Sequence, residues 1–421
     1  MHACKMDKNN NFAKRWRVLS GENEWEGLLE PLDLDLRRYV IHYGERAQAI
    51  ADAFNAETKS KNCGLSRYPA EGFFSHVGLD RGNPFKYEVT TFFYAAYGDL
   101  DGGGSGKVFK KSSSPLAETE TSNCIGYVAV ATDEGKVALG RRDVLVVWRG
   151  SVVSEDWTAD FNSELVSAQD TLGTTHFPRV HKDWYSIYTA NNNSKFNLTS
   201  ARDQVFLEVK KLLTKYQEEE LSITVTGHSM GAALATLNAV DMAYNKVNLL
   251  FSGQPNKTTP TTVPITAIVF ASPRVGDRGF GNVFSDLNTG GGGNLHLLRV
   301  NELLDVVPQY PLTIQGYVDV GQLLLLMVIK SPYIKPLLTL ADDPSKWLAI
   351  HDLELHLHGV AGTHGVFGEF KLKIDRDLGL MNKGGDLVKD EYGKIVSWWT
   401  EKNKSMVQND DGSWELEDSR K

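Results

Sequence analysis

Cysteine is rare in this sequence, and the few thiols form no recognisable group. The 421 residues contain three cysteines, Cys4, Cys63 and Cys124, with no Cys-x-x-Cys pair and no grouping with histidine at metal-ligand spacing. Disulfide scaffolds and cysteine-held metal sites depend on such pairs, so the sequence argues against both. A reducing compartment is the simpler interpretation of so few thiols.

Dense basic segments are also lacking. Lys and Arg number 45 and Asp and Glu number 53, which gives a net charge of −8. This balance argues against nucleic acid as the main partner and against strong electrostatic attachment to anionic membranes. Hydrophobic residues make up 41% of the chain, which is enough for a sizeable core.

No apolar run is long enough to cross a bilayer. The most apolar run, at residues 323–329, is far shorter than the roughly 20 residues that a transmembrane helix needs. The first residues, MHACKMDKNN, mix charges with asparagine and do not form the apolar segment of a secretory signal. We therefore expect a soluble cytoplasmic protein without a transmembrane segment.

Helix and strand patterns alternate through the middle of the chain. In chain order they are a helix at 205–216, a strand at 222–226, a helix at 232–243, a strand at 265–270, a helix near Phe280 and a strand at 295–300. This alternation predicts the α/β class, with a mostly parallel central sheet flanked by helices.

The flanking regions complete the expected single domain of residues 1–421. Strands are expected at 127–131 and 144–148, joined by a turn at Asp133-Glu134-Gly135. Apolar residues at helical spacing predict an N-terminal helical region at about 23–60, interrupted near Pro31. The α/β core is expected at about 120–370, and a C-terminal extension at about 371–421.

The segment Gly227-His228-Ser229-Met230-Gly231 fits the pattern Gly-x-Ser-x-Gly. A serine hydroxyl is a poor nucleophile unless it is presented to a base, and a tight strand-to-helix turn achieves this. The close approaches in that turn leave no room for side chains two residues on either side, hence the glycines. The strand pattern before the motif and the helix pattern after it predict Ser229 as a nucleophile, whereas His228 points away and packs.

A base and an acid should follow the nucleophile along the chain, in the order serine, acid, histidine. The histidines after Ser229 are His296, His351, His356, His358 and His364. His296 lies inside a predicted strand and is expected to be structural. Residue patterns alone do not choose among the other four.

Asp305 is the leading candidate for the acid because it follows the predicted strand at 295–300. Folds of this class place their chemistry in loops at the C-terminal ends of strands. An acid there would orient the imidazole and stabilise its charged form. Asp277, Asp286 and Asp319 remain alternatives.

Donors for an oxyanion are expected in two places. The strand at 144–148 ends in Arg149-Gly150-Ser151, a small-residue turn that can donate a backbone N–H, expected to be that of Ser151, to an oxyanion. The second donor would be the N–H of Met230, directly after the nucleophile.

Several segments together resemble the class 3 lipases, and more closely the plant phospholipases A1 of class II. The segments shared with class 3 lipases are, in order, VVWRGS, VHKDWYSIYT, GHSMGAALA, FASPRVGD and NELLDVVP. Those shared with the plant group are WEGLLEPLDLDLRRYVIHYGE, SRYPAEGFF, GYVDVG, KSPYIK and HDLELHLHGVAGTHG. The resemblance covers about residues 25–410.

The resemblance implies an α/β-hydrolase fold with Ser229 as nucleophile, Asp305 as acid and His351 as base. His356 stands where the family pattern has an aromatic residue. A mobile lid is implied around residues 154–164, and no metal or organic cofactor is implied.

The implied activity is release of the sn-1 fatty acid from phospholipids such as phosphatidylcholine at a membrane or micelle surface. Mono- or diacylglycerols and galactolipids are alternative substrates. A lipase-like signalling scaffold without hydrolysis is an alternative of another class. The oligomeric state is left open.

Overall fold

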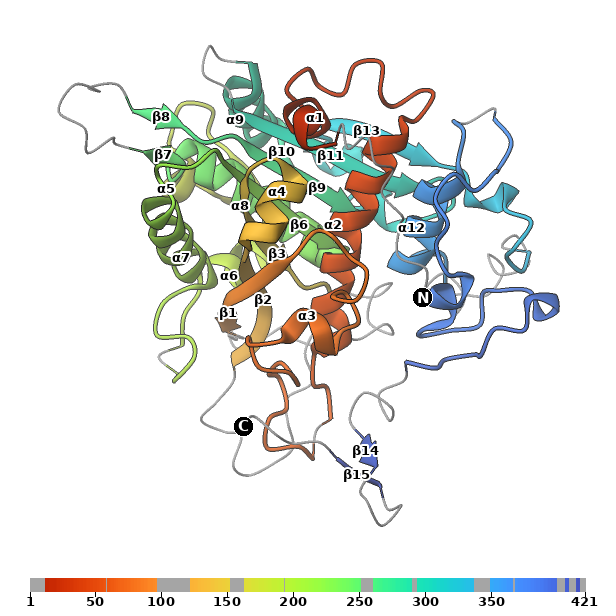
Figure 1. Ribbon diagram of the computed structural model, residues 1–421. Coiled ribbons are helices and arrows are strands. Elements are labelled where there is room, and N and C mark those ends of the chain that lie inside the picture. The colour runs from red at the N-terminus through yellow and green to blue at the C-terminus, as the bar shows by residue number, and fades with distance from the viewer. Residues whose placement is uncertain are drawn as a thin grey trace.

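The computed structural model describes residues 12–57, 59–96, 122–151, 163–192, 194–250, 260–289, 294–336, 349–365 and 368–399, together with short strands at 406–408 and 414–416. Its centre is a sheet with the strand order β1-β2-β3-β6-β9-β11-β13 (Figure 1). The bounds are β1 Tyr87–Ala96, β2 Ser122–Ala131, β3 Arg142–Trp148, β6 Leu221–His228, β9 Ile265–Phe270, β11 Leu295–Glu302 and β13 Gln322–Leu326.

In this sheet the strands pair in parallel from β3 through β6, β9 and β11 to β13, whereas β1 and β2 run antiparallel at one edge. Strands β3, β6 and β9 are buried on both faces, which explains their continuous apolar and β-branched sequences. The predicted mostly parallel sheet flanked by helices is confirmed.

Helices cover both faces of this sheet (Figure 1). One face packs against α1 Phe12–Leu19, α2 Leu34–Ala53, α3 Phe73–His76, α4 Asp133–Leu139 and α12 Leu353–Gly362. The other packs against α5 Gln169–Leu172, α6 Lys182–Thr189, α7 Ala201–Lys215, α8 Met230–Tyr244 and α9 Arg278–Thr289. Two hydrophobic cores result, one on each side of the sheet.

Smaller elements surround this framework. A second sheet has the order β12-β10-β5-β4, with β12 Tyr317–Val318, β10 Gly276–Asp277, β5 Arg179–His181 and β4 Leu165–Ser167. Two short pairs are β7 Leu249–Leu250 with β8 Thr261–Thr262, and β14 Met406–Gln408 with β15 Trp414–Leu416. The 3₁₀ turns are η1 Val307–Gln309, η2 Thr313–Gln315, η3 Val328–Lys330, η4 Leu378–Asn382 and η5 Asp390–Tyr392.

Two local predictions need correction. The expected turn at Asp133-Glu134-Gly135 is the first turn of α4, because the Thr132 side chain caps the helix by accepting from Gly135 N. The N-terminal helical pattern is helical only from Leu34, where Asp33 caps α2; the preceding residues form turns. Trp25 in those turns is nevertheless buried and donates its indole N–H to Leu19 O.

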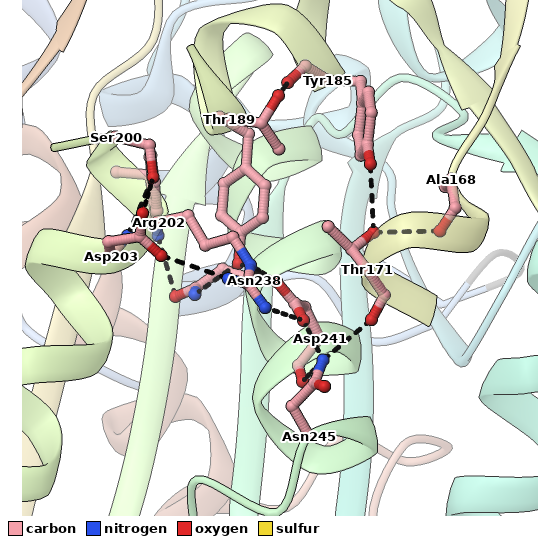
Figure 2. A network of polar contacts seen from close by, with 12 residues as sticks. Ala168, Thr171, Tyr185, Thr189, Ser200, Arg202, Asp203, Asn238, Asp241 and Asn245 are labelled. Carbon is pink, nitrogen blue, oxygen red and sulfur yellow. Dashed lines mark hydrogen bonds and ion pairs between the residues drawn. The ribbon is translucent and has the colours of Figure 1, made fainter. Parts of the chain in front are cut away.

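A buried polar network fastens the helices that pack around α8 (Figure 2). The Asp241 carboxylate of α8 accepts from Tyr188 OH of α6 at 2.8 Å and from Arg202 of α7 at 3.1 Å. Asn245, the C-cap of α8, extends the network by donating to Thr171 O of α5 at 2.8 Å. These contacts fix the helix that begins directly after Ser229.

Within the described part of the chain, none of the helices combines the length and the apolarity that a bilayer crossing requires.

Candidate active site

Ser229 lies in the tight turn between β6 and α8. Its backbone has φ 62° and ψ −130°, the residue is 2% exposed, and its Oγ has no hydrogen-bond partner among the described residues. A Cβ on Gly227 would lie 2.4 Å from Gly231 O, and one on Gly231 would lie 2.3 Å from Trp148 O. The structure therefore confirms the strand, turn and helix predicted around Ser229, and the reason for the two glycines.

The turn after β3 packs directly against Ser229. A Cβ on Gly150 would lie 2.7 Å from His228 O and 3.4 Å from the Ser229 Cβ, so only glycine fits. Arg149 braces this turn, because its guanidinium donates to Gly150 O at 2.8 Å and to Cys124 O at 2.9 Å. Ser151 follows in this turn, and Met230 is the first residue of α8. The oxyanion role of both residues stays a prediction.

Asp305 and His351 form a buried pair. His351 Nδ1 donates to Asp305 Oδ2 at 2.8 Å, and Val307 N donates to the other carboxylate oxygen at 3.0 Å. Burial opposes ionisation of Asp305, but the charge and hydrogen bond of His351 and the polar contact with His356 outweigh it and lower the pKa of Asp305 below its ordinary value. The carboxylate is therefore anionic at neutral pH and fixes Nδ1 of His351 as the protonated nitrogen.

His228 connects the Asp305–His351 pair to the turn that carries Ser229. Its Nε2 donates to His351 O at 2.8 Å, and the two rings lie 4.6 Å apart. Burial lowers the pKa of His228 well below its ordinary value, so it is a neutral packing residue, as predicted. Three segments thus converge where β3, β6 and β11 end: the turn at Gly150, the turn at Ser229 and the loop at Asp305.

The other predicted histidines lie elsewhere or act structurally. His358 Nε2 bonds Ser331 Oγ at 2.8 Å, and His364 Nδ1 bonds Gly362 O at 2.9 Å. His296 of β11 pairs with Glu24 at 2.7 Å, in the structural role that the sequence predicted.

The rival aspartates are engaged in other contacts. Asp277 accepts from Arg179 N and Phe280 N, Asp286 pairs with His176, and Asp319 pairs with Arg274 and Arg299. Of the four candidates, Asp305 is the one that the structure places against His351.

The sequence named His356 only as one of four candidate bases, and the structure places it beside the acid. His356 is fully buried in α12, and its Nε2 lies 3.4 Å from Asp305 Oδ2, the oxygen that His351 also contacts. The only sequence signal was its departure from an aromatic residue in the family pattern.

The expected lid falls mainly outside the described residues, since 152–162 are not among them. Ser163, at its downstream end, is described. Its Oγ accepts from Gln315 Nε2 at 2.8 Å, and its carbonyl accepts from Tyr317 OH at 3.2 Å.

The described residues hold no group of three or more side chains suited to binding a metal ion. The arrangement consists of a presented hydroxyl, an imidazole and a buried carboxylate, which together can perform acyl transfer.

Known proteins are similar in sequence to this chain over most of its length. Residues 145–315 match the family described as Lipase (class 3). Phospholipase A1-IIgamma of Arabidopsis thaliana is 46% identical over 412 residues, which are 97% of this chain and 93% of that protein. Phospholipase A1-II 4 of Oryza sativa subsp. japonica is 46% identical over 410 residues, which are 96% of this chain and 95% of that protein.

Solved structures show more distant similarity. The Lip2 lipase of Yarrowia lipolytica is 18% identical, with a TM-score of 0.44 over 70% of this chain and 81% of that chain. A lipase of Rhizopus microsporus var. chinensis is 19% identical, with a TM-score of 0.41 over 70% of this chain and 76% of that chain.

Proposed function

The chain belongs to the class 3 lipases and, within them, to the plant phospholipases A1 of class II, and from this premise we propose that it releases the sn-1 fatty acid of phospholipids such as phosphatidylcholine. Membership of this family makes it a carboxylic-ester hydrolase that acts on acyl lipids. The proposal assigns Ser229 as nucleophile, His351 as base and Asp305 as the acid that orients the base.

One observation supports this assignment above the others. The buried Asp305–His351 hydrogen bond of 2.8 Å lies beside the turn that carries a buried and unpartnered Ser229 hydroxyl. Because this bond keeps a proton on Nδ1, Nε2 of His351 is the nitrogen that accepts the proton of Ser229.

The reaction then proceeds in two halves. Ser229 Oγ attacks the sn-1 carbonyl carbon while His351 Nε2 takes its proton, and backbone N–H groups of Ser151 and Met230 stabilise the oxyanion. Collapse of this intermediate breaks the ester C–O bond, and His351 returns the proton to the departing lysophospholipid oxygen. Water, deprotonated by His351, then releases the fatty acid from Ser229.

The test uses phosphatidylcholine vesicles whose sn-1 and sn-2 chains differ. We expect the purified protein to release the sn-1 acid, and Ser229→Ala to release neither. Sampling at early times prevents acyl migration from obscuring the position of cleavage. Preferential release of the sn-2 acid would contradict the positional assignment.

Parallel assays separate the alternatives. Hydrolysis of diacylglycerol or galactolipid without hydrolysis of phosphatidylcholine would reassign the head group. If none of these lipids is hydrolysed and a fluorophosphonate probe does not label Ser229, a non-hydrolytic scaffold would be favoured.

A cytoplasmic site of action is also part of the proposal. It is supported by the low cysteine content and is tested by imaging a fluorescent fusion of the full chain.

A further inference from the structure

His356 of α12 lies between two hydrogen-bond acceptors. Its Nδ1 is 2.9 Å from Asp352 O, and its Nε2 is 3.4 Å from Asp305 Oδ2. A neutral imidazole carries a single N–H, so one of its two nitrogens would face an acceptor with a lone pair. The ring is fully buried, so solvent does not relieve that repulsion. Nε2 has no hydrogen-bond partner among the described residues, so in a neutral ring with its proton on Nδ1 the Nε2 lone pair would face the Asp305 carboxylate. Protonation of both nitrogens turns this contact into an ion pair, and His356 is then a cation.

The surroundings of His356 suit a positive charge. Burial disfavours the cation, but Asp305, Asp352 O and Glu302 outweigh it and raise the pKa of His356. Burial raises the pKa of Glu302 to about 7, while His356 opposes that rise. Burial and Glu354 raise the pKa of the Asp352 carboxyl to about 6.

Other charged groups near α12 are engaged elsewhere. Glu354 pairs with Arg376 and Lys383, and Arg37 of α2 donates to Val360 O. Lys330 of η3 donates to Gly368 O at 2.9 Å. The neighbouring rings of His351 and His228 lie 6.5 Å and 6.1 Å from that of His356.

We propose that His356 is a positioning residue, a doubly protonated imidazole that holds Asp305 for His351 and keeps a positive charge beside the reacting groups. Asp305 then accepts hydrogen bonds from Val307 N on Oδ1 and from His351 on Oδ2, and it pairs with the His356 cation across 3.4 Å. These three contacts leave the carboxylate little freedom to rotate away from His351. The inference rests on the proposed function, since it assigns His351 as the base.

The charge has a measurable consequence. A cation near His351 opposes protonation of that base, so it lets the enzyme work at lower pH. Across the 6.5 Å between the two rings, a unit charge shifts a protonation equilibrium by about one to two pH units at an effective dielectric constant of about 20. Removing the charge should move the acidic limb of the kcat/KM profile to higher pH by this amount.

Two substitutions separate the charge of His356 from its polar contact with Asp305. His356→Gln keeps an N–H donor but loses the charge, so we expect the shift in the acidic limb with kcat lowered only a few-fold. His356→Phe loses both, so we expect the same shift and a fall in kcat of about tenfold or more, because an apolar ring then lies beside the buried Asp305 carboxylate.

His358 provides the matched control. It is two residues further along α12 and equally buried, but it bonds Ser331 and not Asp305. His358→Phe should lower stability and leave the acidic limb in place. An unshifted limb in His356→Gln, or an equal shift in His358→Phe, would overturn the inference.

A measurement on the wild-type protein needs no variant activity. ¹⁵N NMR of labelled histidines at neutral pH should show protons on both nitrogens of His356, with the signal assigned by its loss in a His356 variant. A neutral tautomer would overturn the inference even if the triad is correct. Conversely, full activity of folded His351→Ala would overturn the proposed function, while the NMR result would still report the charge of His356.

Discussion

At the residue scale, Ser229 combines a strained backbone with a buried hydroxyl. A non-glycine residue at φ 62° and ψ −130° costs on the order of 1–3 kcal/mol, and here it is held by the 2.9 Å bond from Ser229 N to Phe270 O. Alanine retains the same Cβ and the same strain. Removal of the hydroxyl should therefore leave the fold unchanged.

Ser229→Ala should abolish hydrolysis by a factor on the order of 10⁶ without changing the melting temperature. His351→Ala should match that loss, and the double variant should be no worse, because the residues act as a unit. Steady-state kinetics and circular dichroism of the three variants check this. A double variant that is far slower than either single one would show that the two side chains act independently.

Asp305→Asn should lower kcat by about 10⁴, since an amide in place of the carboxylate no longer stabilises the charged imidazole or fixes its tautomer. The matched control is Asp319→Asn, whose carboxylate pairs with Arg274 and Arg299 at the surface. That variant should keep its kcat within a few-fold. If Asp319→Asn were the damaging change and Asp305→Asn harmless, the acid would be misassigned.

His358 should make the fold sensitive to acid. Burial and Arg376 lower its pKa to about 3, so the folded state holds it neutral while the unfolded chain protonates near its ordinary value of 6.5. The contribution of neutral His358 to the free energy of unfolding is complete above pH 6.5 and is lost as the pH falls from there towards 3.

Between pH 6.5 and 5 the loss amounts to about 2 kcal/mol. His358→Phe removes the titration and keeps an aromatic ring between Tyr333 and Phe370. Urea unfolding at the two pH values should show a smaller acid loss in this variant. An unchanged loss would mean that other groups carry the acid sensitivity.

At the scale of elements, α12 is held by a buried ion cluster from the C-terminal part of the chain. Glu354 of α12 pairs with Arg376 and Lys383, which also pair with Glu45 and Asp52 of α2. Figure 1 shows α2 and α12 side by side, and Ile374, Met381 and Leu387 share their core. This packing positions the helix that carries His356 and follows His351.

Glu354→Gln should destabilise the fold by about 3–5 kcal/mol, because it leaves two buried cations short of a carboxylate. Asp386→Asn is the control, since its pair with Lys335 is solvent-exposed and is worth at most about 1 kcal/mol. Chemical unfolding of both variants provides the comparison. Equal losses would show that the buried cluster contributes no more than a surface pair.

Local sequence patterns predicted the elements around Ser229 because those elements are encoded locally. Strand β6 is a continuous β-branched and apolar run, and the two glycines mark the close approaches on either side of Ser229. The pattern failed at Asp133-Glu134-Gly135, because these residues suit both a turn and the first turn of a capped helix. The Thr132 cap and the packing of α4 against α1 favour the helix.

The partners of Ser229 were harder to predict, because their meeting depends on tertiary structure. Asp305 and His351 are 46 residues apart in the sequence and come from different elements. Residue patterns left four histidines open, and the resemblance to class 3 lipases selected His351. His356 was named only as a candidate base, because nothing local reveals that the turn of α12 places it beside Asp305.

At the scale of the whole molecule, exposed apolar side chains gather in the loop that follows β11. Leu303, Tyr310, Leu312 and Ile314 are among the exposed large hydrophobic residues, and Ile314 is 89% exposed. The loop contains Asp305, and its Gln315 bonds Ser163 at the end of the expected lid. An apolar rim beside the site that cleaves a lipid ester is suited to contact the lipid surface.

Ile314→Asp should therefore slow hydrolysis of phospholipid vesicles by about tenfold or more, since the charge must leave water at the interface. Hydrolysis of a soluble short-chain ester should be unchanged, because Ile314 is not among the residues around Ser229. Leu207→Asp on α7 is the matched control, since Leu207 is 74% exposed but lies on a helix outside this loop. It should slow the hydrolysis of neither substrate.

Of the four combinations of variant and substrate, only Ile314→Asp acting on phospholipid vesicles should be slow. Equal slowing of the soluble ester would place Ile314 in the catalytic machinery, and equal slowing by Leu207→Asp would remove the loop from the interface.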